Sequence, residues 1–427
     1  MLIEFRLSNF RSIAEEQVLS LVATSAEDST ERPRSVTGSN KKLLPVVAIY
    51  GANASGKTSV LAGLAYMREA ILLSHRIWEP EGGTRREPFA WGGMQGQPSI
   101  FEVTAVIGGI RYQYGFRVDD QRFLEEWLYA WPAGRKQTWL ERDADVLKFG
   151  AALADEKTRL IEEVTRPNAL FLSVAAQHGH ERLAPIFAWF LELECVNTTN
   201  HFGSDYQRAS VTRWLHAHLK SDVQEQESAE NSNSAAKFFV DLLRTADLGI
   251  VDIRTEEIPK VHRQPSFGIG NLSPAIQVFV RHQSQDDHAW LPLEKESLGT
   301  ATLFEYGRRI VEALENGWVL VIDELERSLH PVLALRIVAL FNDAKSNPRN
   351  AQLIFSTHDT NLLGRVLGDA PLRRDQVWLT EKNERGATEL YPLTDFKARK
   401  EENLERGYLQ GRYGAVPVLG NLDVSGD

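Results

Sequence analysis

The chain has 427 residues, of which 43% are hydrophobic and 25% charged, a composition that excludes disordered, collagen-like and fibrous classes. Its 48 Lys and Arg residues against 58 Asp and Glu residues give a net charge of −10, which disfavours a protein that coats nucleic acid mainly by electrostatics but still allows a local basic groove. A single cysteine, Cys195, excludes an intrachain disulfide and a cysteine-rich zinc site.

The first 75 residues predict a strand, a second strand, a glycine-rich turn and a helix. Residues 2–7 alternate apolar and charged side chains, and residues 43–50 form a short apolar run typical of a buried strand. Residues 60–75 then carry apolar side chains at helical spacing. The charged opening lacks the apolar core of a secretory signal, and no run approaches about 18 apolar residues, so we expect a cytoplasmic protein with no membrane span.

The next part of the chain predicts an antiparallel sheet followed by helices. Residues 100–107 and 110–118 flank the pair Gly108-Gly109 and form a predicted hairpin, and strand-like runs follow it at 123–131 and 138–149. Four helical segments are predicted after residue 152: 153–164, 183–193, 211–219 and 235–248. The polar stretch 224–234 between the last two is predicted to be a loop.

Strands and helices alternate again in the last third. Strands are predicted at 251–258, 276–282, 318–322, 352–356 and 377–380, and helices at 301–315 and 331–342. Such alternation favours an α/β fold with a parallel sheet. We expect three parts: 1–151 with the glycine-rich loop and the antiparallel sheet, 152–250 as a helical insertion, and 251–427 returning to complete the parallel sheet.

The strongest motif is Gly51-Ala-Asn-Ala-Ser-Gly-Lys-Thr58, which fits the phosphate-binding pattern G-x-x-x-x-G-K-[ST] between a buried strand and a helix. Glycines let backbone amides converge on phosphates, Lys57 can reach the β- and γ-phosphates, and the Thr58 hydroxyl can bind Mg²⁺. The helix adds the positive end of its dipole. The residues predicted to contact the nucleotide are Asn53, Ala54, Ser55, Gly56, Lys57, Thr58 and Ser59.

A second motif, Trp318-Val-Leu-Val-Ile-Asp-Glu324, is an apolar strand that ends in two acids. The carboxyl end of a strand in an α/β sheet is where nucleotides bind. We expect Asp323 to hold Mg²⁺ and Glu324 to orient and deprotonate the attacking water.

Two weaker motifs gain meaning from their positions. Glu296-Ser-Leu-Gly-Thr300 precedes a helix, so the Ser297 hydroxyl and the Gly299 amide can form a second phosphate-binding helix end. Phe355-Ser-Thr-His-Asp359 ends a short strand, where His358 can donate to a γ-phosphate.

These four motifs, in this order, resemble ABC-type ATPase heads of the SMC, RecF and OLD-like class. The opening Leu7-Ser-Asn-Phe-Arg-Ser12 resembles their first-strand motif, and the ending 408–417 (YLQGRYGAVP) resembles stand-alone AAA-family ATPases of bacterial defence loci. The resemblance implies an α/β P-loop NTPase with a two-lobed head, one mixed and one antiparallel sheet, and a helical insertion. It also implies that Arg11 lies near the nucleotide.

The resemblance further implies partners. Two subunits of such heads enclose two ATP molecules with Mg²⁺, and Ser297 and Gly299 of one copy complete the site of the other. His330 stands where transporter ATPases carry an aspartate, so it is expected at the dimer interface. A glutamine near the nucleotide is also expected, with Gln95 and Gln97 as candidates. Because only 69 residues follow His358, we expect any nuclease or toxin activity to belong to a separately encoded effector.

Three functions remain open from the sequence. The first is an ATPase that controls a partner effector in antiphage defence, the second a DNA-repair or recombination ATPase that clamps DNA, and the third a slowly hydrolysing, nucleotide-locked scaffold for a toxin. Intact Lys57, Asp323 and Glu324 favour hydrolysis. The short basic segments 32–42, 373–374 and 397–412 allow either a solvated surface or DNA contact.

Overall fold

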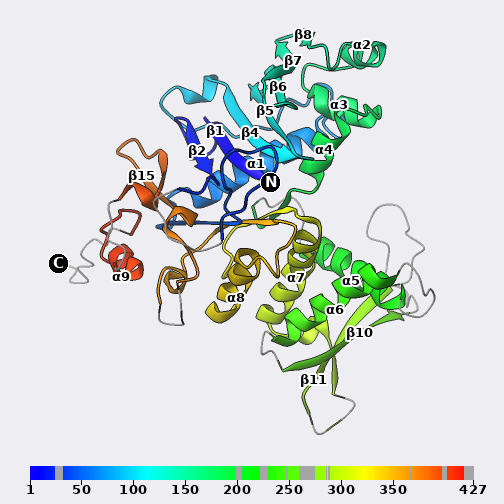
Figure 1. The fold of residues 1–427 in the computed structure, drawn as a ribbon, viewed down its shortest axis with the longest axis vertical. Helices are drawn as coiled ribbons and strands as arrows, with labels where there is room; N and C mark the ends of the chain where they lie inside the picture. The colour runs from blue at the N-terminus through cyan, green and yellow to red at the C-terminus, as the bar shows by residue number, and fades with distance from the viewer. Residues whose placement is uncertain are drawn as a thin grey trace, which may run out of the picture. The chain divides into compact units, whose positions relative to one another are not determined.

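The computed structural model describes residues 1–24, 32–198, 204–221, 229–245, 249–258, 275–284, 286, 289–365, 368, 370–396 and 402–417. The chain forms two compact units (Figure 1). The first unit contains Met1–Thr199, Gly317–Leu325 and Leu335–Asp427, and the second contains Asn200–Asn316 and Glu326–Ala334. The three-part division at residues 151 and 250 stays a prediction.

A six-stranded sheet forms the centre of the first unit, in the order β16-β15-β3-β14-β13-β9. All neighbours pair in parallel except β15 and β16, which are antiparallel. The strands are β16 Thr388–Pro392, β15 Val377–Lys382, β3 Val46–Gly51, β14 Gln352–Ser356, β13 Val319–Ile322 and β9 Glu194–Val196. The predicted parallel sheet is confirmed, and β9 and β16 are additions to it.

A seven-stranded antiparallel sheet, in the order β2-β1-β4-β5-β6-β7-β8, forms the other layer of this unit. Its strands are β2 Gln17–Ser20, β1 Leu2–Ser8, β4 Ser99–Ile107, β5 Ile110–Val118, β6 Phe123–Trp131, β7 Gln137–Asp143 and β8 Val146–Phe149. The predicted hairpin is confirmed as β4 and β5, which pair from Ser99 with Val118 to Ile107 with Ile110. The single run predicted at 138–149 is two strands, because Ala144, with φ of 52°, turns the chain between β7 and β8.

Helix α1, Lys57–Leu73, connects the two sheets of this unit. It contacts β1 and β4 of the antiparallel sheet and β3 and β14 of the parallel sheet. Twelve of its residues are buried, so the helix is apolar on nearly every side, as expected of a central helix. One continuous core therefore includes residues of both sheets and of α1.

Shorter helices cover the remaining parts of the first unit: α2 Glu156–Glu163, α3 Phe171–Gln177, α4 Ala184–Leu191 and α9 Leu404–Leu409. The helices predicted at 153–164 and 183–193 are confirmed as α2 and α4, whereas α3 was not predicted. Helices α3 and α4 both contact α1. Glu126 of β6 is completely buried and accepts the N–H groups of Phe171 and Leu172 at 2.8 and 3.1 Å, so a carboxylate caps the start of α3.

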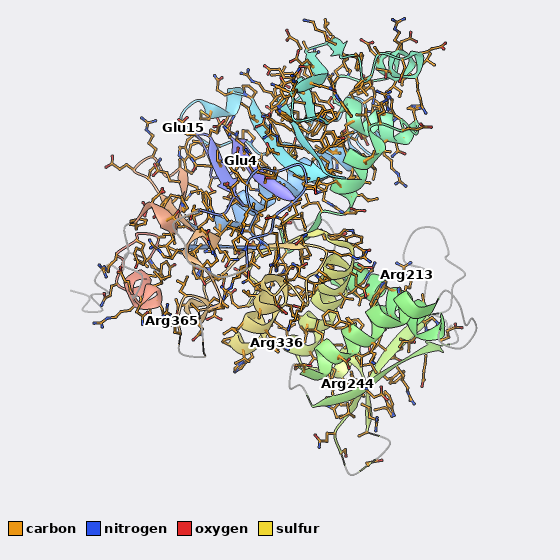
Figure 2. All side chains as sticks on the ribbon, in the orientation of Figure 1. Glu4, Glu15, Arg213, Arg244, Arg336 and Arg365 are labelled. Atoms are coloured by element: carbon orange, nitrogen blue, oxygen red, sulfur yellow. The ribbon has the colours of Figure 1, made fainter. Side chains whose placement is uncertain are left out.

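The second unit packs helices against a small antiparallel sheet. Its helices are α5 Ser204–Ser221, α6 Ala229–Thr245 and α7 Leu298–Asn316, and its strands, in sheet order, are β10 Ile250–Ile258, β11 Ala275–His282 and β12 Trp290–Pro292. Figure 2 labels Arg213 on α5 and Arg244 on α6; Arg244 Nε donates to the carbonyl of Val251 at 2.8 Å and so ties the end of α6 to β10. Helix α8, Pro331–Asn342, contributes its first turn to this unit.

One predicted loop is wrong in part. Residues 229–234 belong to α6, and residues 222–228 lie outside the described residues. None of the helices in the described part of the chain combines the length and apolar character needed to cross a bilayer.

Candidate functional site

The glycine-rich loop runs from the end of β3 into the first turn of α1. Every residue of β3 is buried, so the strand fixes the start of the loop. Gly56 precedes α1 with φ of 111°, a left-handed backbone that favours glycine. The Thr388 side chain, from β16, fills the space where a Cβ of Gly56 would lie. A side chain at position 56 is therefore excluded by both backbone conformation and packing.

Lys57 is the first residue of α1 and is only 6% exposed. Its Nζ donates to the main-chain carbonyls of Gly51 and Ala52 at 2.9 and 3.1 Å. The adjacent Thr58 is exposed at the helix N-terminus. The loop therefore places a cation, the first amides of a helix and a hydroxyl beside one another, as phosphate and Mg²⁺ binding require.

Two serines of the predicted set hold the loop in place. The Ser55 hydroxyl bonds to Thr380 Oγ1 at 2.7 Å, and the Ser59 hydroxyl accepts from Ser12 Oγ at 2.7 Å. These contacts bring β15 and the turn after β1 onto the loop. The remaining members of the set share an exposed position at the loop tip: Asn53 and Ala54.

The two acids after β13 lie in different environments. Asp323 is 6% exposed, whereas the Glu324 side chain is exposed and its φ is 56°. Ser356, at the end of β14, contacts both: its Oγ donates to Asp323 Oδ1 at 2.5 Å and accepts the N–H of Glu324 at 2.8 Å. A left-handed backbone costs a non-glycine residue about 1–3 kcal/mol, and such strain is typical of functional sites.

The segment after β14 is fixed to β3. The N–H of Thr357 donates to the Ile49 carbonyl at 3.1 Å, and the hydroxyl of Tyr50 donates to the Asp359 carbonyl at 2.9 Å. His358, between these anchored residues, is exposed. The backbone on either side of His358 is therefore held in place.

The order of the strands brings these predicted groups to one edge of the sheet. Strands β3, β14 and β13 are adjacent and parallel, so their carboxyl ends lie at the same edge. That edge carries the loop with Lys57, the pair Asp323 and Glu324, and His358. Residues more than 250 positions apart in the sequence therefore lie at the same edge of one sheet in the first unit.

Arg11 lies in the turn next to this site. Its neighbour Ser12 bonds to Ser59 of α1, whereas the guanidinium of Arg11 pairs with the carboxylate of Glu87 at 2.8 Å. Its backbone φ is 49°, and its N–H donates to the Glu87 carbonyl at 2.7 Å. The structure places Arg11 beside the start of α1 with its charge balanced by Glu87, and its contact with a nucleotide stays a prediction.

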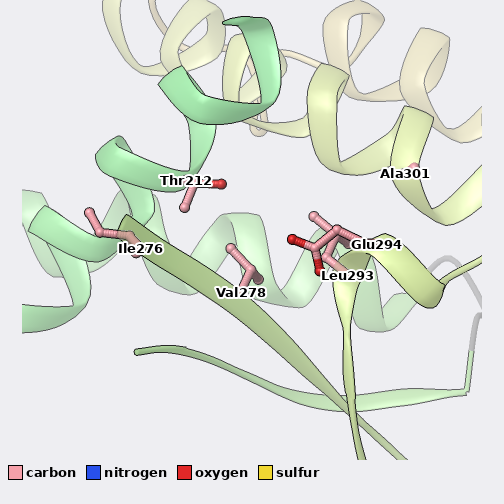
Figure 3. A pocket seen from close by; sticks show the side chains of 6 residues that line it. All are labelled: Thr212, Ile276, Val278, Leu293, Glu294 and Ala301. Carbon is pink, nitrogen blue, oxygen red and sulfur yellow. The ribbon is translucent and has the colours of Figure 1, made fainter. Parts of the chain in front are cut away.

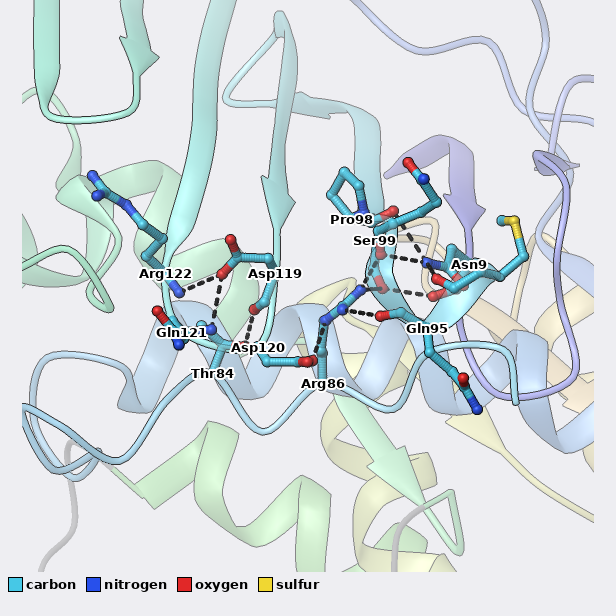
Figure 4. Close-up of polar contacts among 12 residues, drawn as sticks. Asn9, Thr84, Arg86, Gln95, Pro98, Ser99, Asp119, Asp120, Gln121 and Arg122 are labelled. Atoms are coloured by element: carbon cyan, nitrogen blue, oxygen red, sulfur yellow. Dashed lines mark hydrogen bonds and ion pairs between the residues drawn. The ribbon is translucent and has the colours of Figure 1, made fainter. Parts of the chain in front are cut away.

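The two candidate glutamines lie in a loop held by a buried arginine, Arg86, which Figure 4 shows beside Gln95. The Arg86 side chain is 2% exposed, donates to the main-chain carbonyls of Gln95 and Gln97, and pairs with Asp120 at 2.7 Å. The Asn9 amide also donates to the Gln97 carbonyl at 2.7 Å. Both glutamines supply main-chain oxygens to this network, which fixes the loop. The network does not indicate which of the two glutamine side chains would lie near a nucleotide.

The motif around Ser297 lies in the second unit and begins α7. Ser297 Oγ accepts the N–H of Thr300 at 3.1 Å, so it caps the helix. A Cβ at Gly299 would lie 2.8 Å from the Ser328 carbonyl oxygen, so the backbone approaches too closely for a larger residue. Ser297 is exposed, and Leu298 is 65% exposed.

His330 is also exposed and begins α8. Its Nδ1 accepts the N–H of Val332 at 3.3 Å, and its carbonyl accepts the N–H of Leu333 at 2.8 Å. It therefore acts as a helix cap, and its predicted place at a dimer interface stays a prediction.

The site also contains residues that the sequence did not indicate. Ser356, Thr380 and Thr388 contact the glycine-rich loop or the acidic pair from other strands, and Tyr408 packs against Tyr50, just before the loop. Two of them lie within segments that the sequence singled out: Ser356 in the motif that contains His358, and Tyr408 at the start of the ending 408–417. The others are defined by contacts between segments more than 300 residues apart.

The basic segments are largely engaged within the protein. Arg34 is 8% exposed and its Nη2 donates to the Asn342 carbonyl at 2.8 Å. Arg373 pairs with Asp375 at 2.8 Å, with both side chains buried. Residues 397–401 lie outside the described residues. Arg34 and Arg373 therefore serve the fold, whereas Arg406 of the last segment is exposed.

A separate cavity of about 50 Å³ lies in the second unit beneath the start of α7 (Figure 3). The residues that line it come from α5, β11, α7 and the short helix Leu293–Lys295: Thr212, Ile276, Val278, Leu293, Glu294 and Ala301. It has room for about one or two waters, so it is too small for a nucleotide.

The residues at the sheet edge fit a phosphate-bound Mg²⁺. Within the described residues no group of three or more His, Cys, Asp or Glu side chains forms a metal site. The Thr58 hydroxyl and the buried Asp323 carboxylate are oxygen ligands of the kind Mg²⁺ prefers, and Mg²⁺ is usually bound by one or two such groups plus substrate phosphates.

A glycine-rich loop between a buried parallel strand and a helix, with an acidic pair two strands away at the same sheet edge, defines a P-loop ATPase fold. The chain belongs to the family described as "AAA domain, putative AbiEii toxin, Type IV TA system", which matches residues 46–364. No curated protein matches the chain.

Solved structures of SMC head domains are similar to the chain over most of their length. One is an SMC head bound to the C-terminal winged-helix domain of ScpA, with 13% identity, a TM-score of 0.46, and coverage of 91% of this chain and 96% of that one. Another is the head from Thermotoga maritima, with 13% identity, a TM-score of 0.40 and coverage of 92% and 98%. A third, from Pyrococcus yayanosii, has 11% identity, a TM-score of 0.44 and coverage of 96% and 99%.

Proposed function

We propose that the protein binds ATP with Mg²⁺ and hydrolyses it. The observation that carries this proposal is the contact of one residue, Ser356, with both Asp323 and Glu324 at the sheet edge that carries Lys57. In this proposal Lys57 and the helix-start amides bind phosphate oxygens, and Thr58 and Asp323 hold Mg²⁺. Bound Mg²⁺ neutralises developing charge on the phosphates.

Glu324 is the proposed general base. Its main chain is held by Ser356, and its side chain is exposed at the edge of the site, so the carboxylate can accept a proton from a water that attacks the γ-phosphate. His358 is also exposed, from the neighbouring strand, and would donate a hydrogen bond to the same phosphate.

We further propose that two copies dimerise around ATP. Ser297 and the start of α7 are exposed, and two large apolar side chains, Leu298 and Val332, are 65% and 50% exposed in the second unit. A helix N-terminus with an apolar neighbour suits a surface that meets a phosphate and a second protein chain. ATP would thus switch the protein between two assemblies.

We propose that this switch controls a separately encoded effector, in a toxin–antitoxin or antiphage defence setting. The support is the family description, which names a type IV toxin–antitoxin system. A DNA-clamping ATPase is the less supported alternative, because Arg34 and Arg373 of the basic segments engage a main-chain oxygen and a carboxylate of the chain itself.

Nucleotide binding by Lys57→Ala tests the proposal. The variant should lose tight binding of ATP and ADP in titration calorimetry, whereas Lys148→Ala, an exposed lysine of the antiparallel sheet, should bind as wild type. Unchanged binding by Lys57→Ala would show that the nucleotide site lies elsewhere. ATPase activity that rises with added DNA and falls steeply with salt would instead favour the DNA alternative.

A further inference from the structure

The last described segment folds back onto the six-stranded sheet. Residues 403–416, which we call the C-terminal clamp, contain α9 and the turns after it. The N–H of Ala415 donates to Glu381 Oε2 on β15 at 3.2 Å, and the Tyr391 hydroxyl on β16 donates to the Tyr413 carbonyl at 3.1 Å. The clamp is therefore anchored to β15, which neighbours β3, and to β16 at the edge of the sheet.

Tyr408 connects the clamp to the glycine-rich loop. Its side chain is 6% exposed, and its ring packs edge-on against Tyr50 with centroids 5.5 Å apart. Its hydroxyl donates to the Ala415 carbonyl at 3.2 Å. Burial raises the pKa of this hydroxyl, and the nearby backbone N–H of Gly51 opposes that shift. The Tyr408 ring therefore packs on the residue just before Gly51, and the carbonyl of Gly51 accepts from Lys57 Nζ.

Glu405 connects the clamp to the segment that carries His358. Its Oε1 accepts from the Thr360 hydroxyl at 3.2 Å, and its carboxylate occupies the space where a Cβ of Gly364 would lie. Thr360 begins the short helix Thr360–Leu362, two residues after His358. This helix and α9 are in contact.

We propose that the C-terminal clamp is part of the ATP site, with Tyr408 and Glu405 as positioning residues for Lys57 and His358 respectively. The inference rests on the proposed ATPase function. In this proposal neither Tyr408 nor Glu405 contacts the nucleotide. Each holds a loop, and the side chain of Lys57 or of His358 on that loop makes the contact. The proposed site is formed by the N-terminal half of the chain and by the ends of β13 and β14. Its geometry then also requires the C-terminal clamp, at the other end of the described chain.

The two contacts predict different kinetic effects. The loop with Lys57 binds phosphates that ATP and ADP share, so loss of the Tyr408 contact weakens both nucleotides. His358 faces the γ-phosphate, so loss of the Glu405 contact lowers kcat for ATP and leaves ADP affinity unchanged. A merely structural role would instead lower both kcat and affinity together with the unfolding temperature.

Tyr408→Phe tests the first contact, because it removes the hydroxyl and keeps the ring. ADP and a non-hydrolysable ATP analogue should both bind about five- to tenfold more weakly, the size of one lost hydrogen bond to a buried group. Tyr129→Phe is the matched control, since it removes a hydroxyl bonded to Glu141 on the antiparallel sheet. Wild-type affinity in Tyr408→Phe would overturn the role of Tyr408.

Three variants test the second contact. Glu405→Ala and Thr360→Val each remove the bond and should lower kcat about five- to tenfold, with no further loss when combined. Glu405→Gln keeps an acceptor oxygen and should restore kcat. Glu402→Gln, which changes an acid paired with Arg412 at the edge of the clamp, is the control.

Two results separate this inference from the proposed function. If wild-type protein neither binds nor hydrolyses ATP, the proposed function is wrong. If it hydrolyses ATP, Lys57→Ala abolishes that activity, and Glu405→Ala keeps wild-type kcat, then only the inference about the clamp is wrong.

Discussion

The hydroxyl of Ser356 donates a 2.5 Å hydrogen bond to Oδ1 of Asp323, across two neighbouring parallel strands. The same hydroxyl accepts the N–H of Glu324 at 2.8 Å. One small side chain thus orients the proposed metal-binding carboxylate and fixes the left-handed turn that presents the proposed base. These two functions of the acidic pair depend on a residue of another strand.

Ser356→Ala should separate stability from catalysis. The substitution leaves a buried carboxylate oxygen and a backbone N–H without this partner, which costs about 1–3 kcal/mol of folding free energy. It should lower kcat for ATP more than it weakens ADP binding, because ADP binding depends on the Lys57 loop. Ser39→Ala, in a surface turn where the hydroxyl bonds to the Lys41 carbonyl, serves as control. Denaturant unfolding and steady-state ATPase assays measure the two effects, and a wild-type kcat in Ser356→Ala would contradict the role of this contact.

Glu324→Gln should keep nucleotide binding and lose hydrolysis. Removal of a general base typically lowers a rate about 10²- to 10⁴-fold, and the exposed position of Glu324 means that the isosteric amide leaves the fold intact. With ATP and Mg²⁺ the variant should accumulate as a dimer in light scattering after gel filtration. Hydrolysis at the wild-type rate would show that another group activates the water.

Mixing two inactive variants should restore activity if the second unit acts across the dimer. Gly299→Ala places a Cβ against the Ser328 carbonyl and disturbs the start of α7, while Lys57→Ala removes the phosphate-binding cation. An equal mixture should recover about a quarter of wild-type activity, because half of the symmetric dimers become mixed and each mixed dimer holds one intact composite site. Absence of recovery, with both variants folded and dimeric, would exclude the composite site.

The buried histidine of α3's C-terminal turn should make stability depend on pH. His180 is 2% exposed and bonds to Thr158 Oγ1 at 3.1 Å; burial lowers its pKa below the usual 6.5, although Asp155 opposes the shift. The folded state binds the proton on His180 less readily than the unfolded state does. The contribution of neutral His180 to the free energy of unfolding is therefore complete above pH 6.5 and is lost as the pH falls through the lower folded pKa.

Thermal unfolding between pH 7.5 and 5.5 measures this effect. The difference in Tm between wild type and His180→Gln, whose amide can still bond to Thr158, should shrink as the pH falls. A constant difference would show that His180 is not the titrating group.

Much of the site could be predicted from the sequence because its motifs are local. Lys57 and Thr58 follow a buried strand within one short glycine-rich segment, and Asp323 and Glu324 end an apolar strand, so their positions follow from pattern alone. The parallel sheet then follows from the alternation of strands and helices, and its topology places these groups at one edge.

The remainder could not be predicted because it depends on contacts between distant segments. Strand β9 has only three residues and gains its place by pairing with β13, and β16 is defined by its antiparallel partner β15. The polar start of α6 reads as a loop because its sequence carries no apolar residues at helical spacing. Thr388 packs on Gly56 from a position more than 300 residues away, which no local pattern encodes.

The segment that carries the two acids is connected to the second unit at both of its ends. Gly317–Leu325 belongs to the first unit, yet the chain on either side of it, up to Asn316 and from Glu326, belongs to the second. Both ends of this segment therefore continue through the main chain into the second unit. A shift of either connection would therefore displace the main chain of Asp323 and Glu324 directly, without any relay of side chains.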